Sequence, residues 1–561
     1  MKQINRLRAA PASMAMAICL LATVNPAQAQ TAPAEEKGGE EIIVTGSRIR
    51  HDPLDQAAPV VFVDNEDIAR TGLSSVADVL QRLPSSGGAL NGKFNNSGNF
   101  GNPPDGGGVG AGAAEIDLRF LGSRRTLVLV DGLRYVNGAS ASGIPGSTDL
   151  NSIPEGLVDR VEVLLDGASP IYGSDAIAGV VNIITKKNFD GLAASAQVGQ
   201  YRQGDGTTQN YGLTWGTKND NSGTTLVVGV NYVKQDRVSS ADRSISLFPN
   251  PGSTSCLGGG CSSATPLGRF LVNNPADGTG LNLTLKSAVG GRPRFDPLDP
   301  TGPNSDFKGF TTLDRFNFAP FNLILTPSER YGVFVNFGQD LGSRTHFAFK
   351  GVYNRRNSRN QAAPIPLFVG PDSGNGNLLD TISIDVTNPF NPFGVTLDSG
   401  ANGGTRNYDF IARRFVEVGT RRFAQSVDTY YFAGTLDGSF DIGEREWHWD
   451  ASAIYSENTA RQVFLGNVNA QRLQQALGPV SACTGACVPF NIFGGAGSIT
   501  QAQIDFVTFV ERDRSRQTLK DFTANLTGDL FELPAGSVGL AVGVEHRVLR
   551  GSFSPDPIVA A

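Results

Sequence analysis

The 561-residue sequence is poor in the residues that build metal and redox sites, with five cysteines, four histidines and three methionines. This scarcity leaves little material for a His- or Cys-ligated metalloenzyme, so no metal site, catalytic site or cofactor is expected. An excess of basic residues is also missing, because the net charge is −6. Nucleic-acid-binding proteins carry a basic balance, and we therefore expect no nucleic-acid partner.

Long apolar runs are absent from most of the chain, although a helical membrane protein needs about 18 or more successive apolar residues per span. The stretch that comes nearest to this length is at the N-terminus, where basic residues precede apolar residues 13–24. Ala27 and Ala29 then occupy the small-residue positions of a cleavage site. This arrangement is typical of a secretory signal peptide, which we predict at residues 1–29. A short membrane anchor is the alternative, but the run is short and has no charged stop.

Removal of the signal leaves four cysteines in two close pairs, Cys256 with Cys261 and Cys483 with Cys487. Both pairs lie in segments rich in Gly, Ser, Thr and Pro, which indicates loops. Glycine between the paired cysteines lets the chain turn tightly enough to bring two sulfurs together. We predict two small disulfides, which an exported protein can form. A metal clip is the alternative, although no His or carboxylate sits beside either pair.

The tail that follows the signal, residues 30–57, begins with a segment rich in Ala, Pro, Glu and Gly, a composition typical of disorder. A short β-prone run then occurs inside it: Ile42, Ile43, Val44, Thr45 and Gly46. Two interpretations stay open. The run is either the first strand of the next domain or an extended segment that adds to the sheet edge of a partner protein.

The pattern of residues 58–188 predicts a compact α+β domain. Apolar residues spaced three and four apart predict a helix at 76–83, which Pro84 ends. Strands are expected at residues 59–63, 115–120, 126–130, 158–165 and 180–185. Two long polar loops, 85–112 and 137–148, interrupt these elements.

From residue 192 onward, segments of about ten residues alternate apolar and polar positions and end at Gly, Asn or Asp. Such segments are the weak signature of outer-membrane β-barrels, although a soluble β-sandwich alternates in the same way. The export signal, the aromatic strand ends and the mixture of short and very long connections, such as 219–223 and 237–328, favour the barrel. The predicted strands are residues 192–202, 210–218, 224–235, 331–339, 346–354, 429–440, 447–455, 519–531 and 536–547.

Five motifs in the α+β domain are specific enough to compare with a known family. They are ADVLQRLP at 77–84, IDLRFLG at 116–122, LVLVDG at 127–132, RVEVLLDG at 160–167 and IYGSDAIAGVVNIIT at 171–185. These motifs resemble the plug domain of the TonB-dependent outer-membrane receptors. One departure is Phe120, where many members carry Gly, and we expect only local repacking there.

The resemblance implies an α+β plug domain, residues 58–188, inside an antiparallel transmembrane β-barrel, residues 189–561. Family barrels have 22 strands around a plugged lumen, and only about half of that number is recognisable here. We therefore expect the sequence to be a fragment whose barrel is truncated at its C-terminus. By the same resemblance, Ile42 to Gly46 form the TonB box in the flexible tail.

The resemblance also implies a function and partners. It predicts a non-enzymatic receptor in the outer membrane of a Gram-negative bacterium, surrounded by membrane lipid, that binds a scarce extracellular small ligand such as a siderophore or an oligosaccharide. Import would use energy from periplasmic TonB and its inner-membrane complex, since the sequence has no Gly-x-x-x-x-Gly-Lys-[Ser/Thr] nucleotide loop. A passive porin-like channel and a secreted soluble β-protein are the alternatives.

Candidate ligand contacts lie in the two polar loops of the plug. Their aromatic rings and amides suit stacking on, and hydrogen bonding to, a sugar or another polar neutral ligand; the alternative is that they only fill flexible loops. These candidates are Phe94, Asn95, Asn96, Asn99, Phe100 and Asn137. A second set is expected to pair across the plug–barrel boundary, because buried charges need partners. This set is Arg119, Arg124, Arg125, Arg160 and Glu162.

Overall fold

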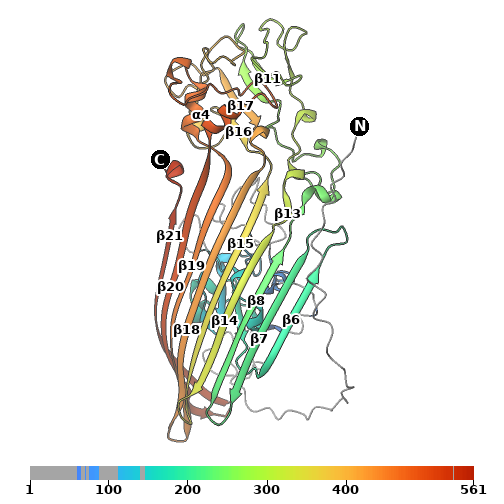
Figure 1. Ribbon diagram of the computed structural model, residues 1–561. Helices are drawn as coiled ribbons and strands as arrows, with labels where there is room; N and C mark the ends of the chain where they lie inside the picture. The colour runs from blue at the N-terminus through green and yellow to red at the C-terminus, as the bar shows by residue number, and fades with distance from the viewer. Residues whose placement is uncertain are drawn as a thin grey trace, which may run out of the picture. The chain divides into compact units, whose positions relative to one another are not determined.

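The computed structural model describes residues 60–64, 68, 70, 75–87, 112–138, 146–534 and 536–560. Figure 1 shows these residues as coloured helices, strands and connections. The predicted signal peptide, the tail with Ile42 to Gly46, and the loop candidates Phe94, Asn95, Asn96, Asn99 and Phe100 lie outside the described residues. These assignments therefore stay predictions.

The plug domain is built on a five-stranded sheet in the order β1-β4-β5-β2-β3. Its strands are β1 (Val60–Asp64), β2 (Thr126–Val130), β3 (Leu133–Arg134), β4 (Val158–Leu164) and β5 (Gly179–Thr185). β2 and β5 run parallel, and the other neighbouring pairs run antiparallel. Every residue of β2 and β5 is buried, which explains why TLVLV in β2 is an unbroken apolar run rather than an alternating one.

Short helices complete the plug: α2 (Val76–Leu80) and α3 (Ser169–Tyr172). Ser75 caps α2, because its side-chain oxygen accepts the backbone N–H of Asp78 at 3.1 Å. The helix predicted at 76–83 therefore begins where expected, but its last three residues form a turn instead.

The strand predicted at residues 115–120 is wrong, because only Leu118 makes a β-bridge there, to Ser86. Arg119 and Phe120 have φ angles of 56° and 59°, a left-handed conformation that strands do not contain. The chain therefore turns within the segment. An alternating pattern this short does not outweigh a turn, whereas the longer patterns of the barrel strands do predict strands.

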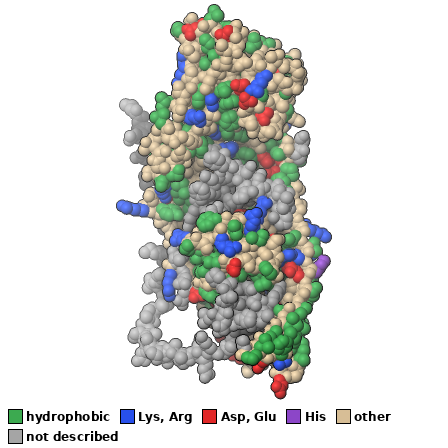
Figure 2. All heavy atoms as spheres, turned by 180° about the vertical axis from the view of Figure 1, so that it is seen from behind, with side chains coloured by type: hydrophobic (Ala, Val, Ile, Leu, Met, Phe, Trp, Pro, Cys, Tyr) green, Lys and Arg blue, Asp and Glu red, His purple; other side chains and the backbone are tan. Residues whose placement is uncertain are grey.

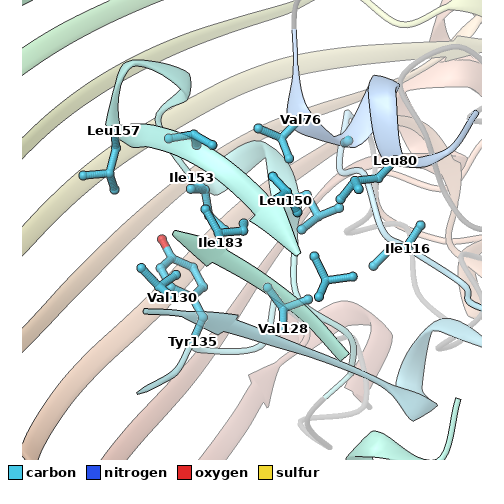
Figure 3. Packing of buried hydrophobic residues seen from close by; sticks show 14 of the residues in the cluster. Val76, Leu80, Ile116, Val128, Val130, Tyr135, Leu150, Ile153, Leu157 and Ile183 are labelled. Atoms are coloured by element: carbon cyan, nitrogen blue, oxygen red, sulfur yellow. The ribbon is translucent and has the colours of Figure 1, made fainter. Parts of the chain in front are cut away.

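The hydrophobic core of the plug lies on one face of its sheet. Leu80, Val128, Leu157 and Ile183 are almost fully buried, and Figure 3 shows them converging from α2, β2, β5 and the segment before β4. The same cluster also contains side chains of the barrel sheet described next, among them Val227, Phe334, Val352 and Tyr431. The plug and the barrel sheet thus share one core, which fixes the plug against the barrel wall.

A nine-stranded antiparallel sheet forms the barrel wall, in the order β21-β20-β19-β18-β15-β14-β8-β7-β6. Its strands are β6 (Gly191–Gly199), β7 (Thr208–Asn219), β8 (Thr224–Gln235), β14 (Ser328–Asp340), β15 (Thr345–Ala362), β18 (Arg421–Ile442), β19 (Arg445–Val468), β20 (Thr508–Leu533) and β21 (Gly536–Ser554). A short helix, α6 (Pro557–Ala560), follows β21.

Each of the nine predicted barrel segments overlaps one of these strands. The expected length of about ten residues is too short for β18, β19 and β20, which have 22, 24 and 26 residues. The additional residues carry polar side chains on both faces of the sheet, as in ERDRSRQT at 511–518 of β20. Because the apolar alternation stops there, the sequence pattern does not reveal the full strand.

The barrel sheet is open in the described part of the chain, because β6 and β21 each pair with a single neighbour. Its two ends differ (Figure 1). Short turns, residues 220–223, 341–344 and 443–444, join strands at one end, and the long connections 236–327 and 363–420 leave from the other. Outer-membrane barrels have short periplasmic turns and long extracellular loops. The fold is therefore an α+β plug against part of such a barrel.

Three long connections fold together into a cap, defined here as residues 236–327, 363–420 and 469–507. The cap contains a second five-stranded sheet, in the order β12-β11-β10-β17-β16. No helix in the described residues, those of the cap included, is long and apolar enough to cross a membrane. The elements of the cap are β9 (Val238–Ser239), β10 (Arg269–Asn273), β11 (Gly280–Leu285), β12 (Phe307–Gly309), β13 (Leu323–Leu325), β16 (Pro366–Val369), β17 (Tyr408–Arg414), α4 (Ala470–Leu477) and α5 (Gln501–Val507).

A separate hydrophobic core holds the cap together. Phe270, Phe307 and Phe493 are fully buried in it, and the ring centroid of Phe270 lies 5.5 Å from that of Phe307 and 5.7 Å from that of Phe493. The sequence pattern predicts only a long connection at residues 237–328. The structure shows instead that it supplies half of a folded unit, whose strands are short and whose partners are distant in the chain.

Disulfide bonds close two loops of the cap. They join Cys256 to Cys261 and Cys483 to Cys487, which are the pairs expected from the spacing of the cysteines.

Candidate functional site

Buried cations of the barrel sheet reach the carboxylates of the plug. Residues alternate along β14 and β15, and the even-numbered side chains face the plug. Arg356 of β15 lies 3.1 Å from Asp149, with 3% and 5% of the two side chains exposed. Lys350, also in β15, forms an ion pair with Asp131. The plug–barrel interface is therefore a set of desolvated charge pairs set beside the shared hydrophobic core.

The Asp131 carboxylate is fixed by the turn between β2 and β3. Asp131 and Gly132 have φ angles of 50° and 79°, which suits the two-residue hairpin turns that favour Asp-Gly. Its carboxylate accepts the backbone N–H of Thr185 at 2.9 Å and the hydroxyl of Thr185 at 2.6 Å. Asn336 of β14 donates its side-chain amide to the same hydroxyl at 3.1 Å. The ends of β2 and β5 are thus joined to β14 and β15 at one point.

The Asp149 carboxylate organises the base of the two polar plug loops. It accepts the backbone N–H groups of Ala114 and Asn151, both at 3.0 Å, in addition to its ion pair with Arg356. The Asn151 amide in turn donates to the backbone carbonyl of Gly112 at 2.9 Å. A Cβ at Gly112 would lie 2.7 Å from the side chain of Ser358, and the residue has a φ of 77°. Glycine is required here because the loop base touches the barrel wall.

Arg330 and Glu155 form a third contact between barrel and plug. Arg330 of β14 donates to the side-chain oxygen of Asn151 and lies 3.3 Å from the Glu155 carboxylate. Asn210 of β7 donates its amide to the same carboxylate at 2.6 Å. Burial raises the pKa of Glu155 to about 7, and the charge of Arg330 and the Asn210 hydrogen bond offset only part of this effect.

Two further contacts connect the plug to the far side of the sheet. The Tyr135 ring stacks on Tyr431 of β18 with centroids 5.0 Å apart, and burial raises the pKa of Tyr135 above its usual value. Arg134 of β3 lies 2.7 Å from Asp175 in the plug and 3.8 Å from Glu545 in β21. The plug therefore contacts the sheet from β7 to β21.

The charged residues predicted to pair across this boundary make their described contacts within the plug instead. Arg119 lies 3.8 Å from Asp166, and Arg160 lies 3.0 Å from Glu162, so both of these ion pairs are within the plug. The guanidinium of Arg125 donates to the backbone carbonyl of Leu121, also within the plug. Arg124 belongs to the short helical turn that precedes β2, and no ion pair between it and the barrel is found in the described residues.

The cations that do make the contacts, Arg330, Lys350 and Arg356, carry a signal in the sequence. They occupy the inward positions of strands whose outward positions are apolar, such as Val333 and Phe349. A charge at such a position must face a polar partner inside the barrel.

Asn137 is the ligand-contact candidate that the structure describes. Its side-chain amide donates to the backbone carbonyl of Gly146 at 2.7 Å, so the donor group joins the two ends of a plug loop. This contact supports the loop-filling alternative for the amide nitrogen of Asn137.

A wall of amides and hydroxyls lines the inner face of β18, β19 and β20 toward the cap. Gln425 donates to Gln462 at 2.9 Å, and Asn458 donates to Thr429 at 2.7 Å. All four side chains are buried. Because these side chains are buried and bonded to one another, the wall satisfies its own polar groups inside the barrel.

The cap presents a second surface with recognition chemistry. The Arg269 guanidinium lies over the rings of Phe310 and Phe410, 4.6 Å and 5.3 Å from their centroids, and donates to the amide oxygen of Asn282 at 3.0 Å. Arg269 alternates with the buried Phe270, so this cluster faces away from the cap core. No group of His, Cys, Asp and Glu side chains able to hold a metal ion occurs among the described residues.

Comparison with known proteins identifies the plug domain. Residues 52–180 match the family model described as the TonB-dependent receptor plug domain. This part of the chain is therefore a TonB-dependent receptor plug domain, and in the described residues a nine-stranded antiparallel sheet follows it. Members of this family are transport receptors rather than enzymes.

Similar solved structures include three receptors of this kind. The siderophore receptor PiuA from Acinetobacter baumannii is 14% identical, with 91% of this chain and 65% of that chain covered and a TM-score of 0.34. The ferric preacinetobactin receptor BauA from the same organism is 11% identical, with 89% and 59% covered and a TM-score of 0.40. A mutant of the ferric enterobactin receptor PfeA from Pseudomonas aeruginosa is 13% identical, with 92% and 56% covered and a TM-score of 0.39. The chain spans less than two thirds of the length of each.

Proposed function

We propose that this chain is part of an outer-membrane receptor that binds a scarce extracellular ligand and imports it with energy from periplasmic TonB. The observation that carries the proposal is a family-matched plug domain held against a barrel wall by buried ion pairs. A plug domain bound to the inner face of the barrel sheet argues against a passive porin, because the lumen of a porin is an open aqueous channel. The outward apolar residues of the sheet argue against a secreted soluble protein.

The proposed mechanism needs an external pull because the outer membrane holds no ATP. Ile42 to Gly46, as the TonB box, would add a strand to TonB through backbone hydrogen bonds. Force applied there reaches β1 first, since β1 is the first described strand after the box. β1 pairs with β4, and β4 pairs with β5. The pull would therefore arrive at Thr185, at the end of β5, where Asp131, Lys350 and Asn336 meet.

The chemistry of the proposed ligand is open between two classes. The aromatic rings and amides in the sequence from Phe94 to Phe100 suit a neutral polar ligand with faces for stacking, as in an oligosaccharide. The Arg269 cluster of the cap suits an aromatic or anionic group, as in a siderophore. Growth of a deletion strain across iron, cobalamin and carbon sources would identify which class is transported.

A deletion in the full-length protein tests the proposal. Removing residues 42–46 is expected to reduce uptake of the identified ligand to background while surface binding stays at the wild-type level, because the ligand surfaces lie elsewhere. Removing residues 33–37, an equally long piece of the same tail, is the control and should leave both unchanged. Uptake that persists without residues 42–46 would contradict the proposed use of TonB.

A further inference from the structure

One face of the cap sheet carries an arginine that is held between two aromatic rings. Arg269 of β10 is on the face opposite the cap core, since the next residue, Phe270, is buried in that core. The guanidinium carbon of Arg269 lies 4.6 Å from the ring centroid of Phe310 and 5.3 Å from that of Phe410. Its Nε donates to the side-chain oxygen of Asn282 at 3.0 Å. The described residues offer no acceptor to its two terminal nitrogens, so the guanidinium is fixed with these donors free.

A second arginine, Arg315, lies close enough for its charge to act on Arg269. Burial and, to a smaller extent, the charge of Arg315 lower the pKa of Arg269 below its usual value. Arg315 itself donates to the backbone carbonyl of Cys261 at 3.1 Å. The adjacent carboxylate, Asp314, is bound to Lys308 at 2.6 Å. In the part of the chain that the structure describes, neither Arg269 nor Arg315 has a carboxylate partner.

Other basic side chains of the cap are paired with acidic ones. Arg294 lies 3.0 Å from Asp306, and Arg406 lies 2.6 Å from Asp409. Figure 2 shows basic and acidic side chains next to one another on the cap, at the top of the view. The two arginines without a carboxylate are therefore a departure from the way in which this protein balances charge on the cap.

A third guanidinium adds positive charge to the same region. Arg414 of β17 lies 4.9 Å from the ring centroid of Phe316, the residue after Arg315. It donates to the backbone carbonyls of Ala264 and Pro364 at 3.3 Å and 2.8 Å. Burial, together with the charge of Arg421, lowers the pKa of Arg414 to about 9. Because carbonyl dipoles offset a buried charge only in part, an anion bound nearby would stabilise this region.

The Cys256–Cys261 disulfide fixes the position of Arg315. Ser262, which follows the disulfide, exchanges two backbone hydrogen bonds with Phe316, at 3.0 Å and 2.9 Å. The backbone of Arg315 is thus held by its neighbour, and its side chain is held by the carbonyl of Cys261. The spacing of the cysteines predicts the disulfide but not this role, because Arg315 is 54 residues from Cys261 in the chain.

We propose that Arg269 and Arg315 bind the carboxylate groups of a polycarboxylate ligand, and that the Cys256–Cys261 disulfide positions Arg315 for this contact. A planar guanidinium with free terminal nitrogens binds a planar carboxylate through two parallel hydrogen bonds. Two such groups without counter-ions match two carboxylates of one ligand and do not match a neutral sugar. The inference deepens the proposed function, on which it rests in one respect: the polycarboxylate would belong to the imported ligand.

The test is a calorimetric titration of the full-length receptor in uncharged detergent with three probes: tricarballylate, its neutral triamide, and inorganic phosphate. Wild type is expected to bind tricarballylate at least about tenfold more tightly than either of the other two probes, since the fork of a guanidinium matches a carboxylate. Arg269→Gln and Arg315→Gln should each weaken tricarballylate binding about tenfold, and the double variant about 100-fold, as the loss of one and two charged hydrogen-bonded contacts would give.

A matched control removes an arginine of the cap that already has a carboxylate partner. Arg294→Gln, whose partner is Asp306, should bind tricarballylate within twofold of wild type. Trypsin digestion of the cap and a heat-modifiable gel shift of the barrel establish that each variant is folded. If Arg269→Gln makes the cap sensitive to trypsin, Arg269→Lys keeps the charge without the planar fork and is expected to bind about fivefold more weakly than wild type.

The positioning role of the disulfide has its own test. Cys256→Ala/Cys261→Ala should weaken tricarballylate binding about fivefold, whereas removal of the other cap disulfide in Cys483→Ala/Cys487→Ala should leave it within twofold of wild type. In an Arg315→Gln background, loss of the Cys256–Cys261 bond should change the affinity by less than twofold, because the group that it positions is already gone. A disulfide with a merely structural role would weaken binding equally in both backgrounds.

Tricarballylate binding that is unchanged in the double arginine variant would overturn the site. Equal affinity of wild type for the triamide or for phosphate would overturn the polycarboxylate class. These outcomes are distinct from a failure of the proposed transport function, because the deletion of residues 42–46 is read out as uptake and is expected to leave binding at the cap intact. Uptake that persists after that deletion would remove the role of TonB and leave the arginine site standing.

Discussion

At the scale of single residues, the ion pairs between plug and barrel are better suited to defining position than to adding stability. Burying a charge pair costs roughly as much desolvation energy as the pairing returns, whereas removing one partner costs about 3–5 kcal/mol. Asp131 with Lys350 and Asp149 with Arg356 are such pairs. They make one placement of the plug strongly preferred. If water enters the plug–barrel interface as the plug moves, the separated charges become solvated. A polar interface therefore opens at a lower free-energy cost than an apolar one.

Glu155 gives this interface a pH dependence that can be measured. Its pKa is about 7 in the folded protein and about 4.3 in an unfolded chain. The folded state therefore binds more protons between these values, so stability falls as pH rises from about 4.5 to about 7. The whole effect is at most about 4 kcal/mol. Plug stability, followed by protease susceptibility of the full-length receptor, should decline over this window in wild type.

Glu155→Gln removes the titration and should flatten the profile between pH 4.5 and 7 without affecting more acidic values. Asp166→Asn is the matched control, since Asp166 is an exposed plug carboxylate whose nearest cation is Arg119 at 3.8 Å, and its profile should follow wild type. A decline of the same size in Glu155→Gln would show that another group is responsible.

At the scale of elements, the predictions from sequence succeed where structure is local and repetitive. The buried run of β2 (Thr126–Val130) and the alternating barrel segments are recognisable because each strand's own pattern reports its burial. The partners of the inward-facing cations are not recognisable in this way. Lys350 and Asp131 are 219 residues apart, and Arg356 and Asp149 are 207 apart. Such pairing depends on how the plug seats in the barrel, which no local pattern encodes.

The sequence pattern does not predict the cap. We expect the cap to unfold separately from the barrel. Phe270→Ala removes a fully buried ring from the cap core, which typically costs about 3–5 kcal/mol. We expect the variant to become sensitive to trypsin within residues 236–327 while the heat-modifiable gel shift of the barrel persists. The separate hydrophobic clusters of plug and cap are the physical reason for this expectation.

Leu313→Ala is the control for that experiment, since Leu313 lies in the same part of the cap and is 77% exposed. Its digestion pattern should match wild type. Loss of the barrel's gel shift in Phe270→Ala would mean instead that cap and barrel unfold together.

At the scale of the whole molecule, the proposed function assigns separate tasks to three surfaces. The cap would face the ligand side, the plug–barrel interface would open and close the passage, and the outward face of the sheet would meet lipid. Asn336 of the barrel helps to hold the plug–barrel interface closed, because it donates to both the Thr185 hydroxyl and the Lys186 carbonyl, at 3.1 Å and 2.8 Å. In the proposed mechanism, the plug has to leave this contact before a ligand can pass. Locking the contact should therefore block transport without changing the ligand surfaces.

A reversible crosslink in the full-length receptor tests this requirement. Thr185→Cys combined with Asn336→Cys places two thiols at positions whose side chains are now hydrogen-bonded. Formation of the disulfide is verified by mass spectrometry before uptake is measured, because the bond needs Cα atoms no more than about 7 Å apart. In the oxidised state, uptake of the identified ligand is expected to fall at least tenfold while surface binding stays at the wild-type level, and reductant should restore uptake. The two single-cysteine variants, and wild type under the same reductant, control for the native cap disulfides. If the crosslink forms completely and uptake continues at the wild-type rate, passage of the ligand does not require separation of β5 from β14. The ligand must then cross elsewhere along the plug–barrel interface.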